Sequence, residues 1–509
     1  FDLAWWQSVL EILVQRDSSI LSFSAEQLDQ LEKTYSEADA ELIAKGPGMI
    51  AKVLADRWHS AIAAEPAQTA ALKEALKARQ ISLPLLNQIG SGLLPAVAPV
   101  VMVSPFEAPS MLTSQRFDVA VIMDGAVSTV AENLSVLSRS NQVVVFGDDA
   151  IAAAEGFEVE NRIRSLGRVV EADSIYEVAK KTLGAETLRI SYRTSGQTLG
   201  GLVNREFYQN RIVYEPTPDE LEGKKSHSIE IITEGANASS TIDGATESPE
   251  AEVRRVVDLV LNHALWHPQQ SLVVASASQV HADRIKNTLQ KELKTKPDLA
   301  AFFDAHGREK FEVVGIADLA HRIADRIIFT VGFGLTPGGG VSSDFGQLSG
   351  SNGRRYLANA LVSARKQITV VSCITAEVIP ADGLSSGAHL LKTLLSSAED
   401  GGHVPGDHEG DSMLGDLAKR LKRLGVRVDA SFAERLPLVA AFADKNAVIV
   451  PDWTLRGESW SEKLRLRPAL LRAMGWKYIR VHSFDLFADP QAVAHRIAED
   501  LGMQLSKQP

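Results

Sequence analysis

The segment EAEVRRVVDLVLNHALWHPQQSLVVASASQVHADRIKNTLQKEL, residues 250–293, decides the fold class of this chain. It reads as an amphipathic helix over 250–265, an apolar strand over 271–278 and a second amphipathic helix over 278–293. A strand this apolar is typical of a parallel sheet that helices cover on both faces. The segment therefore predicts an α/β fold.

The same alternation of short β-branched runs and helix-like spacers extends over most of the chain. We expect these runs to be parallel strands buried on both faces. The runs are PAVAPVVMVS (95–104), FDVAVIMD (117–124), NQVVVFGDD (141–149), TLRISYRT (187–194), FEVVGIADL (311–319), DRIIFTVGF (325–333) and QITVVSCI (367–374).

The first part of the chain has a different pattern. Residues 4–80 show helical periodicity, and Ser24 stands in N-cap position before an acidic first turn. The stretch AKGPGMIAK (44–52) is rich in glycine, and we interpret it as a turn between helices. This part should form a helical segment.

Composition and linker signals divide the chain into five parts. The stretch AEDGGHVPGDHEGDS (398–412) carries five acidic and no basic residues, so it is expected to be a linker. A compact α/β pattern follows it, with strands expected in RVDASFA, LPLVAAF, NAVIVPDW and KYIRVHS. The expected parts are a helical segment (1–95), the end of a first α/β domain (96–165), a second α/β domain (166–398), the linker (399–412) and a C-terminal domain (413–509).

The composition excludes several protein classes. With 45% hydrophobic and 23% charged residues, the chain is typical of a globular protein, and no stretch is long and apolar enough to span a bilayer. The single cysteine, Cys373, excludes an internal disulfide and lies in an apolar run, which favours a buried structural thiol. We therefore expect a cytoplasmic protein without a membrane partner.

The charge is unevenly distributed. The net charge is −11, but residues 413–509 carry five more basic than acidic residues. A basic C-terminal domain on an acidic body indicates a polyanion as partner for that domain, although ordinary solvated helix faces would explain it equally well.

The order of these pieces resembles the C-terminal half of large bacterial superfamily-1 helicase-like proteins that end in a Vsr-like nuclease domain. This resemblance implies two RecA-like parallel sheets and a restriction-endonuclease-like α/β domain. It is carried by AWWQSVLEIL (4–13), FDVAVIMDGA (117–126), NQVVVFGDD (141–149), ISYRT (190–194), LVNREFYQNRIVYEPTP (202–218), DRIIFTVGFG (325–334), GRRYLANALVSARKQITVVS (353–372) and LLRAMGWKYIRVHSFDLFADPQAVAHRI (470–497).

The nucleotide-hydrolysis positions that the resemblance implies are degenerate. Hydrolysis needs one carboxylate for Mg²⁺ and another to orient water. Asp124 matches the first, but Gly125 stands where the glutamate belongs. Asp148 and Arg193 match a sensor strand and a phosphate-contacting arginine. No phosphate-binding G-x-x-x-x-G-K-[ST] motif occurs, and since the chain begins at Phe1 without methionine we expect that loop upstream.

The arginine finger and the nuclease site are degenerate as well. Ser363 occupies the finger position, and Arg365, two residues further along the same expected helix, should point elsewhere. Pro437 and Val450 replace the two acidic residues of the implied nuclease site, and Asp452 is the carboxylate that survives. A single aspartate holds catalytic Mg²⁺ poorly, so we expect no resident metal.

These substitutions predict a pseudoenzyme that keeps a helicase–nuclease scaffold for nucleic-acid binding or for assembly with a protein partner. The alternative is an ATP-dependent DNA helicase or nuclease with relocated residues and an upstream phosphate-binding loop. ATP and Mg²⁺ are expected as cofactors only in that second case. DNA is the expected polymer ahead of RNA.

Basic and aromatic residues in two segments are the candidates for nucleic-acid contact. Core packing is the alternative for Tyr208, and a solvated helix face is the alternative for the C-terminal cluster. The candidates are Arg205, Tyr208 and Arg211 beside Arg193, and Lys463, Arg465, Arg467, Arg472 and Arg480 in the C-terminal domain.

Overall fold

The computed structural model of this chain contains two compact units, Ala40–Thr187 and the combination of Phe1–Asp39 with Leu188–Pro509. Among the helices that the structure describes, none has the length and apolar character needed to cross a membrane. The structure describes residues 2–17, 24–79, 82, 85, 88–89, 92–111, 116–154, 157–158, 169–170, 173–235, 247–304, 309–320, 322–336, 339–397, 411–454 and 459–504.

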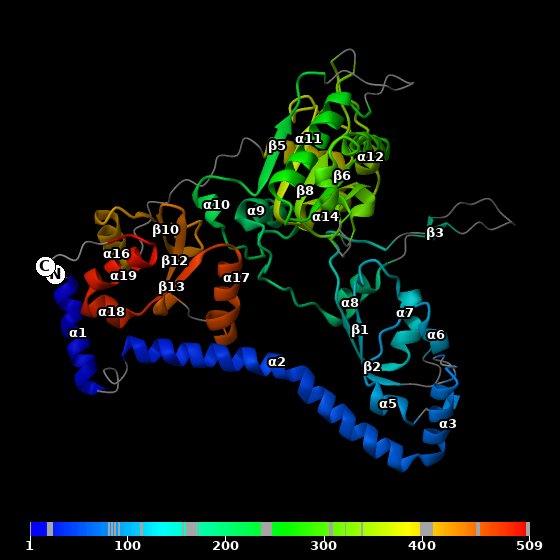
Figure 1. The fold of residues 1–509 in the computed structure, drawn as a ribbon, viewed down its shortest axis with the longest axis horizontal. Coiled ribbons are helices and arrows are strands. Elements are labelled where there is room, and N and C mark those ends of the chain that lie inside the picture. Colours follow the sequence, from blue (N-terminus) through cyan, green and yellow to red (C-terminus); the bar gives the residue numbers. More distant parts are fainter. Residues whose placement is uncertain are drawn as a thin grey trace. The chain divides into compact units, whose positions relative to one another are not determined.

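A five-stranded parallel sheet forms the centre of residues 188–397, which we call the parallel-sheet region (Figure 1). Its strand order is β5-β9-β8-β6-β7. This order confirms the expected α/β class with a RecA-like parallel sheet. The strands are β5 (His227–Ile231), β6 (Leu272–Ser276), β7 (Glu312–Gly315), β8 (Ala324–Thr330) and β9 (Ala364–Ser372).

Helices cover this sheet on both faces, as the apolar strands predict. Alternate residues of β6 enter two different cores, with Val273 and Ala275 in one and Leu272 and Val274 in the other. The first core also holds residues of α9, α14 and α15, and the second those of α11 and α12. The helices of this region are α9 (Gly196–Phe207), α10 (Pro218–Leu221), α11 (Glu250–Trp266), α12 (Gln279–Leu293), α13 (Ala300–Phe303), α14 (Gly353–Ser363) and α15 (Ser386–Ser396), with short helical turns η2 (Pro297–Leu299), η3 (Ile316–Leu319) and η4 (Gly346–Ser349).

Two details of this region differ from the sequence expectation. The run 187–194 is not a strand, because it forms only an isolated bridge between Ile190 and Val213. The edge strand β5 comes instead from His227–Ile231, which pattern analysis missed. An edge strand pairs on one side only, so its short polar sequence lacks the apolar run of a central strand.

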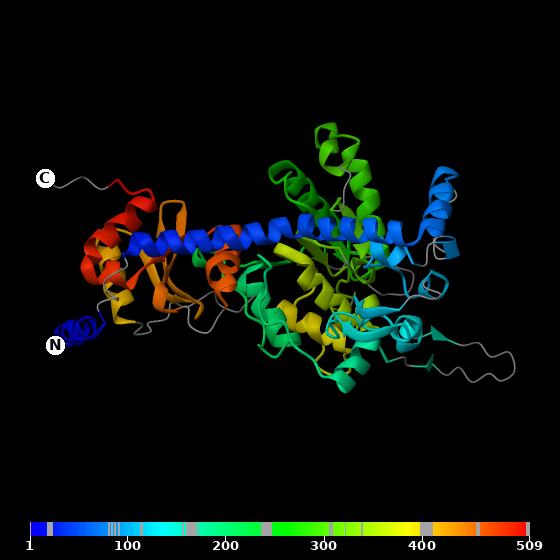
Figure 2. The same ribbon diagram turned by 90° about the horizontal axis from the view of Figure 1, so that it is seen from below.

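A second sheet forms the centre of the C-terminal module, residues 411–504. Its strands lie in sequence order, with β10–β11 and β11–β12 antiparallel and β12–β13 parallel. Helices α16 and α19 share a core with one face of the sheet, and Leu471 of α17 packs against the other (Figure 2). The elements are α16 (Ser412–Arg423), β10 (Arg427–Phe432), β11 (Leu436–Phe442), β12 (Lys445–Pro451), η5 (Asp452–Thr454), the π-helical turn η6 (Glu462–Leu466), α17 (Arg467–Ala473), β13 (Lys477–Val481), α18 (Ser483–Ala488) and α19 (Pro490–Asp500).

The expected linker, 399–412, lies outside the described residues except at its end. Asp411 caps α16, because its carboxylate accepts a hydrogen bond from the Met413 backbone N–H at 2.9 Å. Every strand that the sequence predicts beyond this point is present.

The N-terminal helices agree with the predicted pattern. They are α1 (Asp2–Arg16) and α2 (Ala25–Ala64). Ser24 Oγ accepts a hydrogen bond from the Gln27 backbone N–H at 3.2 Å, and Gln27 Oε1 accepts one from the Ser24 backbone N–H at 2.9 Å. This reciprocal pair confirms Ser24 as the N-cap of α2. The expected turn at 44–52 is wrong, since this stretch lies inside α2 with Pro47 as an internal residue. Glycine and proline therefore weaken this helix without ending it.

The unit Ala40–Thr187 contains a small parallel sheet, β1 with β2, joined through α7. The expectation of strands buried on both faces is wrong here, because Val119, Val121 and Val144 are exposed. Residues 100–104, part of the run expected as a strand at 95–104, form no strand either. The elements are the rest of α2, α3 (Pro66–Lys77), α5 (Leu94–Val97), α6 (Ala108–Met111), β1 (Phe117–Ile122), α7 (Val130–Leu137), β2 (Ser140–Val145), β3 (Phe157–Glu158), β4 (Val169–Val170) and α8 (Ile175–Leu183).

Candidate functional site

The turn after β1 shows why a glutamate would not fit at position 125. Gly125 is buried, and a Cβ atom built on it would lie 2.4 Å from Val145 Cγ1 and 3.3 Å from Ile175 Cγ2. A larger side chain would therefore meet the packing between β2 and α8. Asp124 is exposed and has a positive φ of 53°, which places its backbone in the left-handed region.

Asp148, the second expected carboxylate of this region, has a local structural role. Its Oδ1 accepts a hydrogen bond from the Ala150 backbone N–H at 3.0 Å, and its carbonyl accepts one from Ala152 at 3.2 Å. These bonds close the turn after β2. Within the described residues, the one group of three or more histidine, cysteine or acidic side chains close enough to hold a metal ion does not include Asp124 or Asp148.

The carboxyl ends of the central strands, where open α/β sheets bind ligands, meet a buried polar network. Glu252 of α11 is completely buried, and its Oε1 accepts hydrogen bonds from Thr330 Oγ1 at 2.5 Å and from the Gly332 backbone N–H at 2.8 Å. His281 of α12 lies 3.0 Å from the same threonine hydroxyl and 2.9 Å from Ser248 Oγ. Side chains of α11 and α12 thus occupy the space next to the carboxyl end of β8.

Burial shifts the pKa of both ionisable groups in this network toward the neutral form. It raises the pKa of Glu252 to about 7, against the hydrogen bonds from Thr330 and Gly332. It lowers the pKa of His281 to about 3, with a further contribution from Arg284. Sequence analysis missed this pair, although Glu252 lies on the apolar stripe with Val256 and Val260, an unusual place for a carboxylate.

The arginine-finger position carries no accessible group. Ser363 is the last residue of α14 and is buried, and α14 ends there, so Arg365 belongs to β9 rather than to a continued helix. Arg365 Nη1 donates to Glu309 Oε1 at 2.6 Å, and its Nε donates to Asp325 Oδ1 at 3.2 Å. Arg193 donates to the Val362 carbonyl. The Arg365 charge is therefore neutralised within its own domain.

We expect Arg365→Ala to lower the free energy of unfolding by about 1 kcal/mol, because these groups are partly exposed and solvent screens them. Arg365 lowers the pKa of Glu309 to about 2. The stabilisation is therefore full above the ordinary glutamate pKa and is lost as the pH falls toward 2. Urea unfolding of both proteins at several pH values measures this. Arg365→Lys should retain part of the effect, and an unchanged stability would contradict the structural role.

The implied nuclease positions lie next to each other on the C-terminal sheet. Leu438 pairs with Ile449, and the same antiparallel register continued by one residue puts Pro437 opposite Val450. Val450 is 1% exposed and belongs to an apolar cluster with Leu436, Leu471 and Trp476. The position of the second acidic residue has therefore become part of a hydrophobic core.

Asp452 lies beyond β12, beside His482 at the end of β13. The Asp452 carboxylate accepts hydrogen bonds from the Ser483 backbone N–H at 3.3 Å and from its hydroxyl at 3.2 Å, and its Oδ2 is 3.7 Å from His482 Nδ1. Burial alone would raise the pKa of Asp452, but His482 and Ser483 outweigh it and hold the pKa below its ordinary value. Asp452 and then Asp29 raise the pKa of His482, so the two carboxylates favour the protonated imidazole between them.

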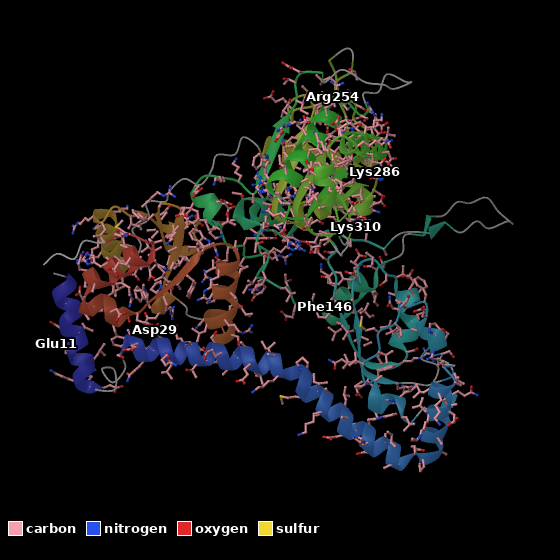
Figure 3. All side chains as sticks on the ribbon, viewed as in Figure 1. Glu11, Asp29, Phe146, Arg254, Lys286 and Lys310 are labelled. Atoms are coloured by element: carbon pink, nitrogen blue, oxygen red, sulfur yellow. The ribbon has the colours of Figure 1, made fainter. Side chains whose placement is uncertain are left out.

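This cluster continues onto the beginning of α2, where Asp29 lies (Figure 3). Ligand atoms of Asp29, Glu32 and His482 lie within 4.8 Å of one another, close enough for a divalent cation. However, Arg480 donates to both carboxylate oxygens of Glu32, at 3.0 and 3.2 Å. A guanidinium already supplies the positive charge, so the geometry supports an ion-pair cluster rather than a metal centre.

The candidates for nucleic-acid contact fall into three groups. Arg465 and Arg480 pair with Asp39 and Glu32 of α2, and Tyr208 packs against the core of the parallel-sheet region. Arg467 is 12% exposed and pairs with Glu215. The exposed candidates are Arg205, Arg211, Arg472 above the Tyr478 ring, and the partly exposed Lys463 above the ring of Trp460.

Trp460 is a residue that sequence analysis missed. Its ring is 64% exposed, and Lys463 Nζ lies 5.1 Å from the ring centre. An exposed aromatic ring with a neighbouring ammonium group offers a base a stacking surface and its phosphate a counter-charge. The sequence signal that could have found this pair is a tryptophan three residues before a lysine, at the start of a helix.

Arg467 belongs instead to a contact between the C-terminal module and the parallel-sheet region. Glu215 is 4% exposed, and its Oε1 lies 3.1 Å from both Arg435 Nη2 and Arg467 Nε. The buried Trp476 donates its indole N–H to the Pro216 carbonyl at 2.8 Å. The two parts therefore share a buried polar contact.

Comparisons with known proteins add little to this geometry. No family model and no curated protein matches the chain. One similar solved structure is the C-terminal domain of a possible DNA helicase from Lactobacillus plantarum WCFS1, with 13% identity over 41% of this chain and 97% of that chain and a TM-score of 0.22. Another is the HK97 bacteriophage large terminase, with 12% identity over 57% and 74% and a TM-score of 0.22. The fold assignment therefore rests on the strand order alone.

Proposed function

We propose that this chain is a non-catalytic nucleic-acid-binding scaffold built on helicase-type and nuclease-type α/β domains. The observation that carries the proposal is the packing at the two positions where the resemblance implies catalytic carboxylates. Gly125 has no room for a side chain, and Val450 lies in an apolar cluster. A single substitution would not restore a catalytic carboxylate in such packing. A carboxylate at position 450, for example, would be buried among apolar side chains.

The binding side of the proposal rests on the C-terminal module. This part of the chain has the basic surplus, and Trp460 with Lys463 and Arg472 above Tyr478 presents cations next to aromatic rings. Phosphate contacts of this kind depend little on sequence and weaken as salt rises, because binding releases counterions. We propose DNA as the ligand, with a base stacked on Trp460.

Fluorescence anisotropy with labelled single-stranded DNA tests this proposal. We expect binding that weakens with salt, and Trp460→Ala with Lys463→Ala should raise Kd about tenfold or more, the loss expected for one stacked base and one phosphate contact. Lys422→Ala is the matched control, because Lys422 is exposed on α16 at the opposite face of the sheet, and it should change Kd little.

Catalysis is tested on the same preparation. We expect no ATP hydrolysis with or without DNA and no DNA cleavage in Mg²⁺ or Mn²⁺. Turnover that Asp452→Ala abolishes would show a relocated site and would overturn the scaffold proposal. If the double variant Trp460→Ala, Lys463→Ala bound DNA as tightly as the wild type, the DNA-binding site would have to lie elsewhere in the chain.

A further inference from the structure

The beginning of α2 presents one face to the C-terminal module. Its partly buried residues, Ala25, Leu28, Glu32, Ser36 and Asp39, recur every three or four positions and so lie on one side of the helix. No residue of α2 is fully buried, so this face has no hydrophobic core of its own. Figures 1 and 2 both show this part of α2 running alongside the module.

Three carboxylates of this helix contact two arginines and a histidine of the module. Asp39 pairs with Arg465, and Asp29 Oδ1 lies 2.7 Å from His482 Nε2. Between them, Glu32 Oε1 lies 3.0 Å from Arg480 Nη2. We call the set Asp29, Glu32 and Asp39 the acidic stripe, and the set Arg465, Arg480 and His482 the basic edge.

The acidic stripe covers cations that would otherwise face solvent. The Arg465 and Arg480 side chains are only 25% and 13% exposed, although Arg465 lies in the turn η6 and Arg480 in the edge strand β13. Ten residues of helix separate the ends of the stripe, which is about 15 Å at the rise of an α-helix. Spaced carboxylates over this length present anionic oxygens in a row, as a nucleic-acid backbone does.

The contact is of a kind that a stronger polyanion can displace. Asp29 is 55% exposed, so its pair with His482 contributes little to stability and is screened by salt, whereas the pairs of Arg465 and Arg480 are more enclosed. Apart from the hydrogen bond between Tyr35 OH and Ser461 Oγ at 3.3 Å, the polar contacts described between α2 and the module are these ion pairs. A nucleic acid carries a much higher charge density than three carboxylates, so it would compete effectively for the same arginines.

The basic edge also adjoins the uncovered candidates. Tyr478 contacts Arg472 through its ring, and Glu32, Arg480 and Arg472 all lie close enough to influence its phenol electrostatically. Lys463 and Arg465 come from the same helical turn, η6. The covered cations and the exposed ones therefore come from the same or neighbouring elements of the module.

We propose that the acidic stripe of α2 occupies the DNA-binding surface of the C-terminal module, and that DNA and α2 compete for Arg465 and Arg480. This inference rests on the proposed function and adds a regulation of the same surface. The exposed pair Trp460 and Lys463 provides the first contact, and displacement of α2 then exposes the basic edge.

The test is anisotropy with labelled single-stranded DNA on the whole chain carrying Asp29→Asn, Glu32→Gln and Asp39→Asn. These near-isosteric changes remove the competing charges and keep the helix. We expect binding about tenfold tighter, and a slope of log Kd against log salt that is steeper by about 1.4–1.8, for two further phosphate contacts. Adding Arg465→Ala and Arg480→Ala should abolish the gain.

The matched control is Glu26→Gln, Glu37→Gln and Glu41→Gln, which removes the same charge from exposed positions of the same helix. Glu37 and Glu41 pair only with lysines of α2 among the contacts described. Equal gains in both triple variants would reduce the effect to net charge and overturn the inference. Wild-type binding that neither variant changes would overturn the inference and leave the proposed function standing. Absence of binding in every protein would reject the proposed function itself.

Discussion

Replacing Glu215 by alanine will lower the free energy of unfolding by about 3 kcal/mol, because it leaves buried arginine charge without its partner. Glu215 Oε1 is 3.1 Å from both Arg435 and Arg467, and Arg467 is only 12% exposed. Arg467 keeps one hydrogen bond, from Nη2 to the Arg435 carbonyl at 3.2 Å. Since Arg435 is 34% exposed and can reach water, the cost should fall at the lower end for a broken buried pair.

Urea unfolding measures the loss of stability, and hydrogen exchange detected by mass spectrometry locates it in the structure. Exchange should increase in α17 and β13, whose neighbour Trp476 bonds to Pro216 across the same contact. Glu215→Gln should have an intermediate effect, since it keeps an acceptor and loses the charge. Glu222→Ala, at an exposed residue of the same segment whose carboxylate pairs with the exposed Lys224, should cost less than about 1 kcal/mol. If Glu215→Ala were as stable as the wild type, the contact between the C-terminal module and the parallel-sheet region would make no contribution to stability.

The compact α/β pattern of residues 413–509 predicts that this domain folds alone, and the same contact bears on that prediction. Removing the parallel-sheet region would expose the indole of Trp476 and leave Arg467 without Glu215. Independent folding stays a prediction. A segment that includes residues 411–504 together with the Glu215–Leu221 stretch would satisfy these groups.

Replacing Glu252 by glutamine will stabilise the parallel-sheet region increasingly as the pH rises. The folded-state pKa of Glu252 is about 7, against an ordinary value of 4.5, so the folded state holds the proton more tightly than the unfolded state. The stability that depends on this proton is complete below pH 4.5 and is lost as the pH rises through 7. At pH 8 the variant should therefore gain up to about 3 kcal/mol over wild type, relative to the same comparison at pH 4.

His281 has the opposite pH dependence and would mask this effect in the wild-type protein alone. Its folded-state pKa is about 3, so its stability contribution is lost as the pH falls from 6.5 toward 3. Between pH 4.5 and 6.5 the two groups nearly cancel. The informative quantity is thus the difference between Glu252→Gln and wild type at each pH.

Urea unfolding across this pH range, with hydrogen exchange in β8 as the local readout, measures the difference. Asp258→Asn is the control, because it removes a carboxylate from an exposed position of the same helix. A constant difference between Glu252→Gln and wild type from pH 4 to 8 would mean that the buried carboxylate does not change its charge in this range.

The sequence by itself determined the elements whose signals are local. The helix–strand–helix pattern of residues 250–293 predicted the covered parallel sheet, the strands beyond Asp411 followed from their β-branched runs, and Ser24 was recognised as a helix cap. The inert residues at 125, 363, 437 and 450 could also be read directly. Each of these features depends on neighbours a few residues apart, which periodicity and residue type record.

Only the tertiary structure decided the features that depend on distant neighbours. Apolar runs alone could not show that β1 and β2 are exposed, or that β5 is an edge strand, because burial depends on which layers cover a sheet. Arg465 and Arg480 looked like free cations in the sequence, yet their partners lie more than 400 residues away in the chain. The raised pKa of Glu252 likewise comes from desolvation by elements that only folding brings around it, since a pKa responds to its three-dimensional surroundings.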